Sequence, residues 1–277
     1  MSQPRLLLRT SHYTEGVVVD TDGTIFFSMT ARGTISRFDA SAQLAVVWAH
    51  VPAANGHAIG PDGAHVVMSS VGAILCLDAS GRAAAVIASV VDGRWLTYPN
   101  DVALDGLRGG FYATDSGYKT TPHTMPADPQ GRVYRVDRVG KVRQVAGGLA
   151  YANGVALSPD GGQLYVGESV TGRIWAYAVL EDGALGVRTL FAQTPVIPGE
   201  TTVPDGIIVG PDSNLYVAHY GAREVLVYAP DGSLAQRLAA GNKTTSHVAF
   251  SPNGRTLYVS GGIEGESGEG AIFAIAL

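Results

Sequence analysis

The sequence has a single cysteine, Cys76, among its 277 residues. One thiol excludes an intrachain disulfide and any metal site built on several thiolates. The chain also lacks a run of about 18 apolar residues of the kind that spans a membrane. Its first residues lack the sustained apolar core and the small-residue cleavage site of a secretory signal. We therefore expect a cytoplasmic protein with no membrane partner.

Positive charge and helical periodicity are also scarce. The 19 Lys and Arg residues are outnumbered by 24 Asp and Glu, so the formal net charge is −5 and offers no basic surface for nucleic acid. No segment shows a long helical period. The 36 glycines and 14 prolines instead favour a fold with many turns, and an apolar share of 46% supplies a sizeable core.

One strand–turn–strand pattern occurs six times. In residues 151–169, Asn153-Gly154 opens an apolar strand that turns at Pro159-Asp160-Gly161 and returns as a second strand. The copies read "EGVVVDTDG", "NGHAIGPDG", "NDVALDGLRGG", "NGVALSPDG", "DGIIVGPDS" and "SHVAFSPNG". They begin at residues 15, 55, 100, 153, 205 and 246, and most are followed by a third strand. Three or four strands every 40 to 50 residues are typical of propeller blades.

We therefore predict an all-β protein, a six-bladed β-propeller that forms one domain over residues 1–277. The last blade has only three strands of its own, ending in "AIFAIAL". The unassigned N-terminal strand "RLLLRT" would complete it, so that the N- and C-terminal strands close the ring in one blade and leave no free edge.

The first residue of each copy is polar, and the six should surround a central channel. They are Glu15, Asn55, Asn100, Asn153, Asp205 and Ser246. Asn and Asp before a strand also cap turns through their own backbone, which is the alternative interpretation for each one alone. Two carboxylates facing one tunnel would repel unless a cation or a proton lay between them. An all-oxygen site favours Ca²⁺, and Mg²⁺ or Mn²⁺ less strongly.

The motifs "EGVVVD", "PNDVALD", "NGVALSPDG" and "PDGIIVGPDSNLYVAHYG" resemble a family of six-bladed propellers. That family includes senescence marker protein (regucalcin), gluconolactonases and luciferin-regenerating-like proteins, and the fifth copy is similar to drug-responsive bacterial lactonases. The resemblance runs from Glu15 to the last copy. It implies a divalent cation, usually Ca²⁺, held by Glu15, Asn100, Asn153 and Asp205. Ligand type alone does not separate Ca²⁺ from Mg²⁺, Mn²⁺ or Zn²⁺ when every ligand is oxygen.

The resemblance also implies hydrolysis of a lactone, a small-molecule substrate. Gluconolactonase-like members often carry an arginine just before the third-copy Asn, where this chain has Tyr98, so a less polar lactone than a sugar lactone is favoured. The cation would polarise the lactone carbonyl. Asp205 is our first candidate for the base that activates water, Asp101 is the second, and Asp205 acting as a nucleophile is a third option.

Several further residues are candidates for contacts with the substrate. They are Asn55, Tyr98, Asn100, Tyr118, Lys119, His219 and His247. Tyr118 and Lys119 belong to a long third-copy loop that could cover the channel. His57 is expected to pack within its own blade, and the Gly-rich "GGIEGESGEG" is expected to be a solvated loop.

Two alternatives stay open. The same metal site could hydrolyse organophosphates or other esters, and the propeller could be a non-enzymatic binding scaffold. The sequence does not indicate the oligomeric state.

Overall fold

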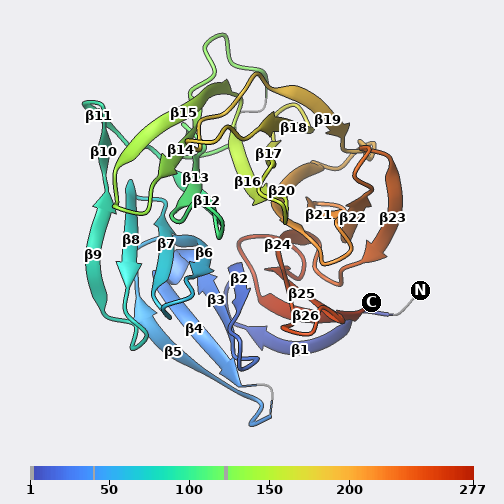
Figure 1. Ribbon diagram of the computed structural model, residues 1–277. Helices are drawn as coiled ribbons and strands as arrows, with labels where there is room; N and C mark the ends of the chain where they lie inside the picture. The colour runs from blue at the N-terminus through green and yellow to red at the C-terminus, as the bar shows by residue number, and fades with distance from the viewer. Residues whose placement is uncertain (1–2, 40, 122–123) are drawn as a thin grey trace.

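The computed structural model describes residues 3–39, 41–121 and 124–277. Antiparallel sheets surround a common centre, and the N- and C-terminal strands lie side by side (Figure 1). The one helix within these ranges is the 3-10 turn η1 (Thr30–Arg32). No helix in the described residues has the length and apolarity needed to cross a membrane. The fold is therefore all-β, as the sequence predicts.

Within the described residues, four of the sheets have four strands each, paired in chain order. The first contains β2 (Glu15–Val19), β3 (Ile25–Met29), β4 (Thr34–Asp39) and β5 (Leu44–His50). The second contains β6 (Ala54–Ile59), β7 (His65–Ser69), β8 (Ala73–Leu77) and β9 (Ala83–Ala88). The third contains β12 (Pro99–Leu104), β13 (Phe111–Asp115), β14 (Gly131–Val136) and β15 (Val142–Leu149). The fourth contains β16 (Ala152–Leu157), β17 (Gln163–Glu168), β18 (Arg173–Ala178) and β19 (Thr189–Gln193).

A larger sheet holds the last strands and the first one. One run of four comprises β20 (Val203–Val209), β21 (Leu215–Tyr220), β22 (Glu224–Tyr228) and β23 (Leu234–Ala239). The other comprises β24 (Thr244–Phe250), β25 (Thr256–Gly262), β26 (Gly270–Ala276) and β1 (Arg5–Thr10). A single pairing, Tyr220 with Thr244, joins the two runs. β1 pairs antiparallel with β26, which is the pairing predicted for the chain ends.

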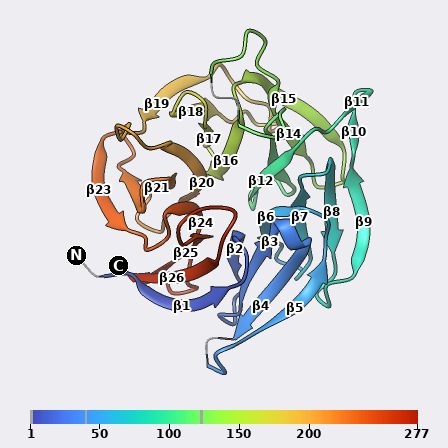
Figure 2. The ribbon, with the colours of Figure 1, turned by 180° about the vertical axis from the view of Figure 1, so that it is seen from behind.

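The first strand of each run of four lies nearest the centre in both views (Figures 1 and 2). Each of these inner strands contacts the next in the order β2, β6, β12, β16, β20 and β24, and β24 contacts β2 again. The ring of inner strands is therefore closed. The six polar residues predicted to face one channel all lie in these strands, each among the first three residues of its strand.

The core consists of apolar clusters between neighbouring sheets. Met68 and Ile74 of the second sheet pack with Phe111 of the third, for example, and all three are almost fully buried. Leu7 of β1 and Ile272 of β26 pack with Phe27 of the first sheet, which closes the ring with apolar contacts as well as strand pairing. Since both faces of the sheets are covered, burial of apolar side chains stabilises every junction that holds the central strands together.

Two features lie outside the predicted repeat. A small hairpin of β10 (Val90–Val91) and β11 (Arg94–Trp95) precedes the third sheet and accounts for extra residues in "SVVDGRW".

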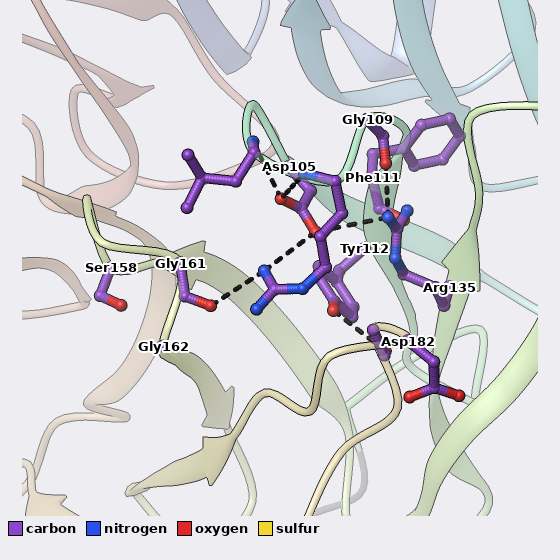
Figure 3. A network of polar contacts seen from close by, with 12 residues as sticks. Asp105, Gly109, Phe111, Tyr112, Arg135, Ser158, Gly161, Gly162 and Asp182 are labelled. Atoms are coloured by element: carbon purple, nitrogen blue, oxygen red, sulfur yellow. Dashed lines mark hydrogen bonds and ion pairs between the residues drawn. The ribbon is translucent and has the colours of Figure 1, made fainter.

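A buried ion pair, 3.3 Å long, joins Arg135 of β14 to Asp105, which lies in the turn between β12 and β13 (Figure 3). Arg108 bonds to Asp105 and to the Gly161 carbonyl of the next sheet. This network ties the β12–β13 turn of the third sheet to the fourth sheet, and its residues line neither of the two cavities described below.

Candidate active site

A cavity of about 580 Å³ lies at the starts of the inner strands. Its lining residues are Tyr13, Glu15, Thr30, Ala31, Asn55, Tyr98, Asn100, Thr121, Tyr151, Asn153, Ser169, Val170, Thr201, Val203, Asp205, Tyr220 and Glu266. Five of the six predicted ring positions are among them. The sixth, Ser246, is not, because its buried hydroxyl donates a 2.8 Å hydrogen bond to the Thr14 carbonyl. A smaller, mostly apolar cavity of about 270 Å³ is lined by residues further along the same strands.

Three asparagines of the ring are held by the same relay of hydrogen bonds. Each amide nitrogen donates to the hydroxyl of a serine that follows the second strand of the same sheet. Each serine donates in turn to the backbone carbonyl just before the next ring residue. The relays are Asn55–Ser70–Pro99, Asn100–Ser116–Ala152 and Asn153–Ser169–Pro204, with amide-to-hydroxyl distances of 3.2, 3.2 and 3.0 Å.

This relay decides which way the amides point. A serine hydroxyl has one hydrogen, and here a carbonyl accepts it, so the hydroxyl can only accept from the asparagine. The amide nitrogen therefore faces the serine, and the Oδ1 oxygen is left for another partner. Among the described residues, the buried Oδ1 of Asn153 has no hydrogen-bond partner. A buried acceptor without a donor is costly, so this oxygen is free to accept a hydrogen bond or to coordinate an ion.

The glycines that follow the ring residues allow the inner strands to approach closely. A Cβ on Gly56 would lie 2.4 Å from the Asn100 carbonyl oxygen, and one on Gly154 would lie 2.2 Å from the Asp205 carbonyl oxygen. A side chain at either position would push apart two neighbouring ring residues. The Asn-Gly pairs are therefore required for a narrow ring, beyond any preference for turns.

The two ring carboxylates are unusual because both line one cavity, Asp205 buried and Glu15 partly buried. Burial raises the pKa of Glu15 to about 7; the Tyr13 hydrogen bond and His247 oppose this shift, and Glu266 adds to it. Burial, followed by the charge of Glu15, raises the pKa of Asp205 well above its usual range, although the Asn153 amide lowers it. Burial thus makes each of these acids easier to protonate than a free side chain when no cation is bound.

Tyrosines form much of the remaining wall. The Tyr13 hydroxyl donates a 2.6 Å hydrogen bond to Oε1 of Glu15 and so fixes that carboxylate. The Tyr98 and Tyr151 rings lie 6.3 Å apart. Tyr151 has a φ of 69°, in the left-handed region that bulky residues rarely adopt, two residues before Asn153. Such backbone strain is often found at functional sites.

Asp101 and His247 do not line the cavity that holds the other ring residues. Asp101 is buried, and its two carboxylate oxygens accept hydrogen bonds from the backbone N–H groups of Val102 and Val155. The His247 Nε2 lies 3.2 Å from Asp101 Oδ1. Burial alone would lower the pKa of His247, but Asp101 raises it above its usual value. The structure therefore places Asp101 in a link between inner strands.

Asn55, Tyr98 and Asn100 line the cavity, whereas three further predicted substrate contacts, Tyr118, Lys119 and His219, do not. The Tyr118 hydroxyl bonds to the backbone of Asp128 and Gln130, and Lys119 is exposed. His219 is fully buried and bonds to Glu224 at 2.9 Å. The long third-copy loop includes residues 122 and 123, which lie outside the described ranges, and Thr121 is its one described residue in the lining. His57 packs within its sheet as predicted, 2.7 Å from His65.

The structure also reveals residues that the sequence pattern did not single out. Tyr13, Tyr151 and Tyr220 line the cavity, and so does Glu266 from the loop expected to be only solvated. The relay serines did carry a signal in the sequence. Each ends the second-strand segment of its copy ("VVMSS", "YATDS" and "YVGES"), 15 or 16 residues after its asparagine.

The oxygen-rich ring fits a hard divalent cation. Among the described residues, no group of three or more His, Cys, Asp or Glu side chains is placed to hold a metal ion. An ion in this cavity would therefore depend on the two carboxylates together with amide oxygens. The unsatisfied Oδ1 of Asn153 and the relays that turn the other amide oxygens away from serine meet that requirement.

The chain is similar in sequence to several lactonases. It is 31% identical to the gluconolactonase of Zymomonas mobilis over 76% of this chain and 61% of that protein. It is 35% identical to lactonase drp35 of Staphylococcus saprophyticus over 72% of this chain and 61% of that protein. The chain thus spans about three-fifths of the length of these curated relatives.

Solved structures share the fold. A Xanthomonas campestris gluconolactonase superimposes with a TM-score of 0.83, covering all of this chain and 95% of that one, at 24% identity. A calcium-binding regucalcin of Agrobacterium tumefaciens gives 0.82, with 99% and 93% covered, at 20% identity. The sequence model of the SMP-30/Gluconolactonase/LRE-like region matches residues 5–262. The chain belongs to the SMP-30/gluconolactonase/LRE-like family.

Proposed function

We propose that this protein is a divalent-metal-dependent lactonase, with Ca²⁺ as the expected ion. Glu15, Asn100, Asn153 and Asp205 would hold the ion. The observation that carries the proposal is the buried Oδ1 of Asn153, which has no partner among the described residues although its amide nitrogen is fixed by Ser169. Sequence similarity to proteins named gluconolactonase and lactonase supports lactone hydrolysis as the reaction.

We further propose that the ring is a six-bladed β-propeller forming one domain. In this description, the eight-stranded sheet counts as two blades, because only the pairing of Tyr220 with Thr244 joins its halves. The closed contact order of the inner strands supports this count.

The chain's own residues would bind the lactone and move a proton. A bound divalent cation would polarise the lactone carbonyl and stabilise negative charge on its oxygen. Asp205 would take the proton from the attacking water, since it lines the cavity and is buried. Tyr13 would keep Glu15 oriented through their hydrogen bond. Asn55 and Tyr98 would contact the substrate from the same wall.

Asp101 is less suited to act as the base. Its carboxylate already accepts two backbone hydrogen bonds and faces His247. Proton transfer requires a group within hydrogen-bonding reach of the attacking water, and Asp101 does not line the cavity.

The proposal is tested with a panel of aliphatic, aromatic and sugar lactones. Protein stripped with a chelator should hydrolyse none of them, and one added divalent ion should restore turnover. Calorimetry with the same ion should show one saturable site. If a folded, metal-bound protein hydrolysed no lactone, hydrolysis of another ester class or the binding-scaffold alternative would replace this proposal.

Metal binding should release protons at neutral pH. Because burial raises the pKa of Glu15 to about 7 and that of Asp205 well above 3.8, the metal-free site is partly protonated there. A cation must displace these protons, so we expect net proton release when the ion binds at pH 7. Affinity should rise with pH as the carboxylates ionise. Calorimetry in buffers of different ionisation enthalpy measures the number released, and heats that do not depend on the buffer would contradict the prediction.

A further inference from the structure

The lining of the main cavity carries negative charge only. Its ionisable acids are Glu15, Asp205 and Glu266, and no Lys, Arg or His is among the described residues that line it. A bound divalent ion would balance two of these charges. The third charge, which we assign to Glu266, would remain unbalanced.

Glu266 is held at the mouth of the cavity by specific contacts. It lies in the loop between β25 and β26, and its Oε1 accepts a 2.8 Å hydrogen bond from the Tyr220 hydroxyl at the end of β21. Arg223 anchors the same loop by donating to the Ile263 carbonyl and to Glu264. Glu266 is itself exposed to solvent, as a residue at an entrance would be.

The cations around this loop pair with other carboxylates. Arg223 pairs with Glu264 at 2.5 Å, and Lys243 pairs with Glu200 at 3.3 Å. Neither cation lines the cavity.

The rest of the wall suits an uncharged, partly apolar molecule. Four tyrosines line the cavity, together with Val170 and Val203. Their rings and methyl groups offer apolar surface, and their hydroxyls offer neutral hydrogen bonds. A volume of about 580 Å³ is ample for a small substituted lactone.

We propose that Glu266 is a specificity-determining residue that makes the cavity select uncharged lactones over lactones bearing a carboxylate or phosphate. This inference rests on the proposed lactonase function. Glu266 accepts a hydrogen bond from a hydroxyl or amide on the substrate and repels an anionic substituent at the mouth. At a separation of about 7 Å and an effective dielectric constant of about 40, one like charge changes binding roughly 10-fold.

Two matched pairs of substrates test the proposal. One pair is gluconolactone and its phosphate ester at the terminal carbon, and the other is γ-butyrolactone γ-carboxamide and the corresponding γ-carboxylate. We expect the wild type to favour the uncharged member by at least about 10-fold in kcat/KM at low salt, and less at high salt. Glu266→Gln keeps an oxygen that can accept from Tyr220 and should reduce the preference about 10-fold. Glu266→Lys should reverse it.

A control variant separates local from general charge effects. Glu269→Gln removes one negative charge from the same loop, but Glu269 pairs with Arg9 and does not line the cavity. Its substrate preference should equal that of the wild type. An unchanged preference in Glu266→Gln, or an equal change in Glu269→Gln, would overturn the assignment.

A binding experiment keeps this test independent of turnover. Pyroglutamide and pyroglutamate are lactam counterparts of the second pair and resist hydrolysis. Wild-type protein should bind the amide about 10-fold more tightly, and Glu266→Gln should remove the difference. If neither lactone of either pair is hydrolysed, the proposed function fails, while the ratio of the two dissociation constants still decides whether Glu266 selects against anions.

Discussion

Replacement of Asp205 by Asn should lower kcat/KM for any lactone substrate by at least about 100-fold, equivalent to about 2.7 kcal/mol of transition-state stabilisation. The amide keeps the shape and one oxygen of the side chain but cannot accept the proton from water. Asp205 is 8% exposed and lines the cavity, so solvent does not readily replace it. Asp205→Asn should retain weak metal binding, whereas Asp205→Ala should lose both metal binding and turnover.

The comparison needs a control that removes the same charge elsewhere. Asp92→Asn changes an exposed residue in the turn between β10 and β11, outside the cavity. It should leave turnover and metal affinity unchanged. Initial rates and calorimetric titrations on the three variants are the measurements required. Full activity in a folded Asp205→Ala variant would remove Asp205 from both proposed roles.

The fold was predictable because the repeat is encoded in local patterns. Each copy combines an apolar strand, a turn rich in Asp and Gly, and a second strand, and these features depend only on neighbouring residues. Closure was predictable for the same reason. The last copy had only three strands of its own, and "RLLLRT" was a strand without a sheet, so β1 could pair with β26. The hairpin of β10 and β11 broke the repeat and could not be inferred from it.

The ring residues were predictable because they occupy one register position in the repeat. Glu15, Asn55, Asn100, Asn153 and Asp205 meet at one cavity for that reason. The exception, Ser246, occupies the same position but has a side chain that bonds to the adjacent Thr14 carbonyl. A register position thus predicts proximity to the channel, whereas side-chain length and local partners decide what reaches the cavity.

Residues from loops could not be predicted in this way. Glu266 reaches the cavity from a Gly-rich loop, and Thr121 reaches it from the long third-copy loop. Asp101 was predicted to act in the cavity but does not line it. It follows Asn100 directly, yet successive residues of a strand point to opposite faces, and its carboxylate bonds instead to the Val155 N–H of the neighbouring inner strand.

Gly154→Ala should unfold the protein at lower temperature and weaken the metal site, although it adds only one methyl group. The Cβ would lie 2.2 Å from the Asp205 carbonyl oxygen, 2.6 Å from the Ile207 nitrogen and 2.9 Å from the Gly206 carbonyl carbon. All three are backbone atoms, so no side-chain rotation relieves the overlap and the two inner strands must separate. Overpacking of this kind costs about 1–3 kcal/mol.

For a chain of this size, that loss corresponds to a fall in melting temperature of about 5 °C. Gly106→Ala is the matched control, because a Cβ there meets no atom within 4 Å and its φ is not positive. A stable Gly154→Ala variant with unchanged metal affinity would show that the inner strands can move apart at no cost. The expected result is lower stability together with weaker metal binding. It would show that Gly154, through its contact with the Asp205 backbone, sets the spacing between Asn153 and Asp205.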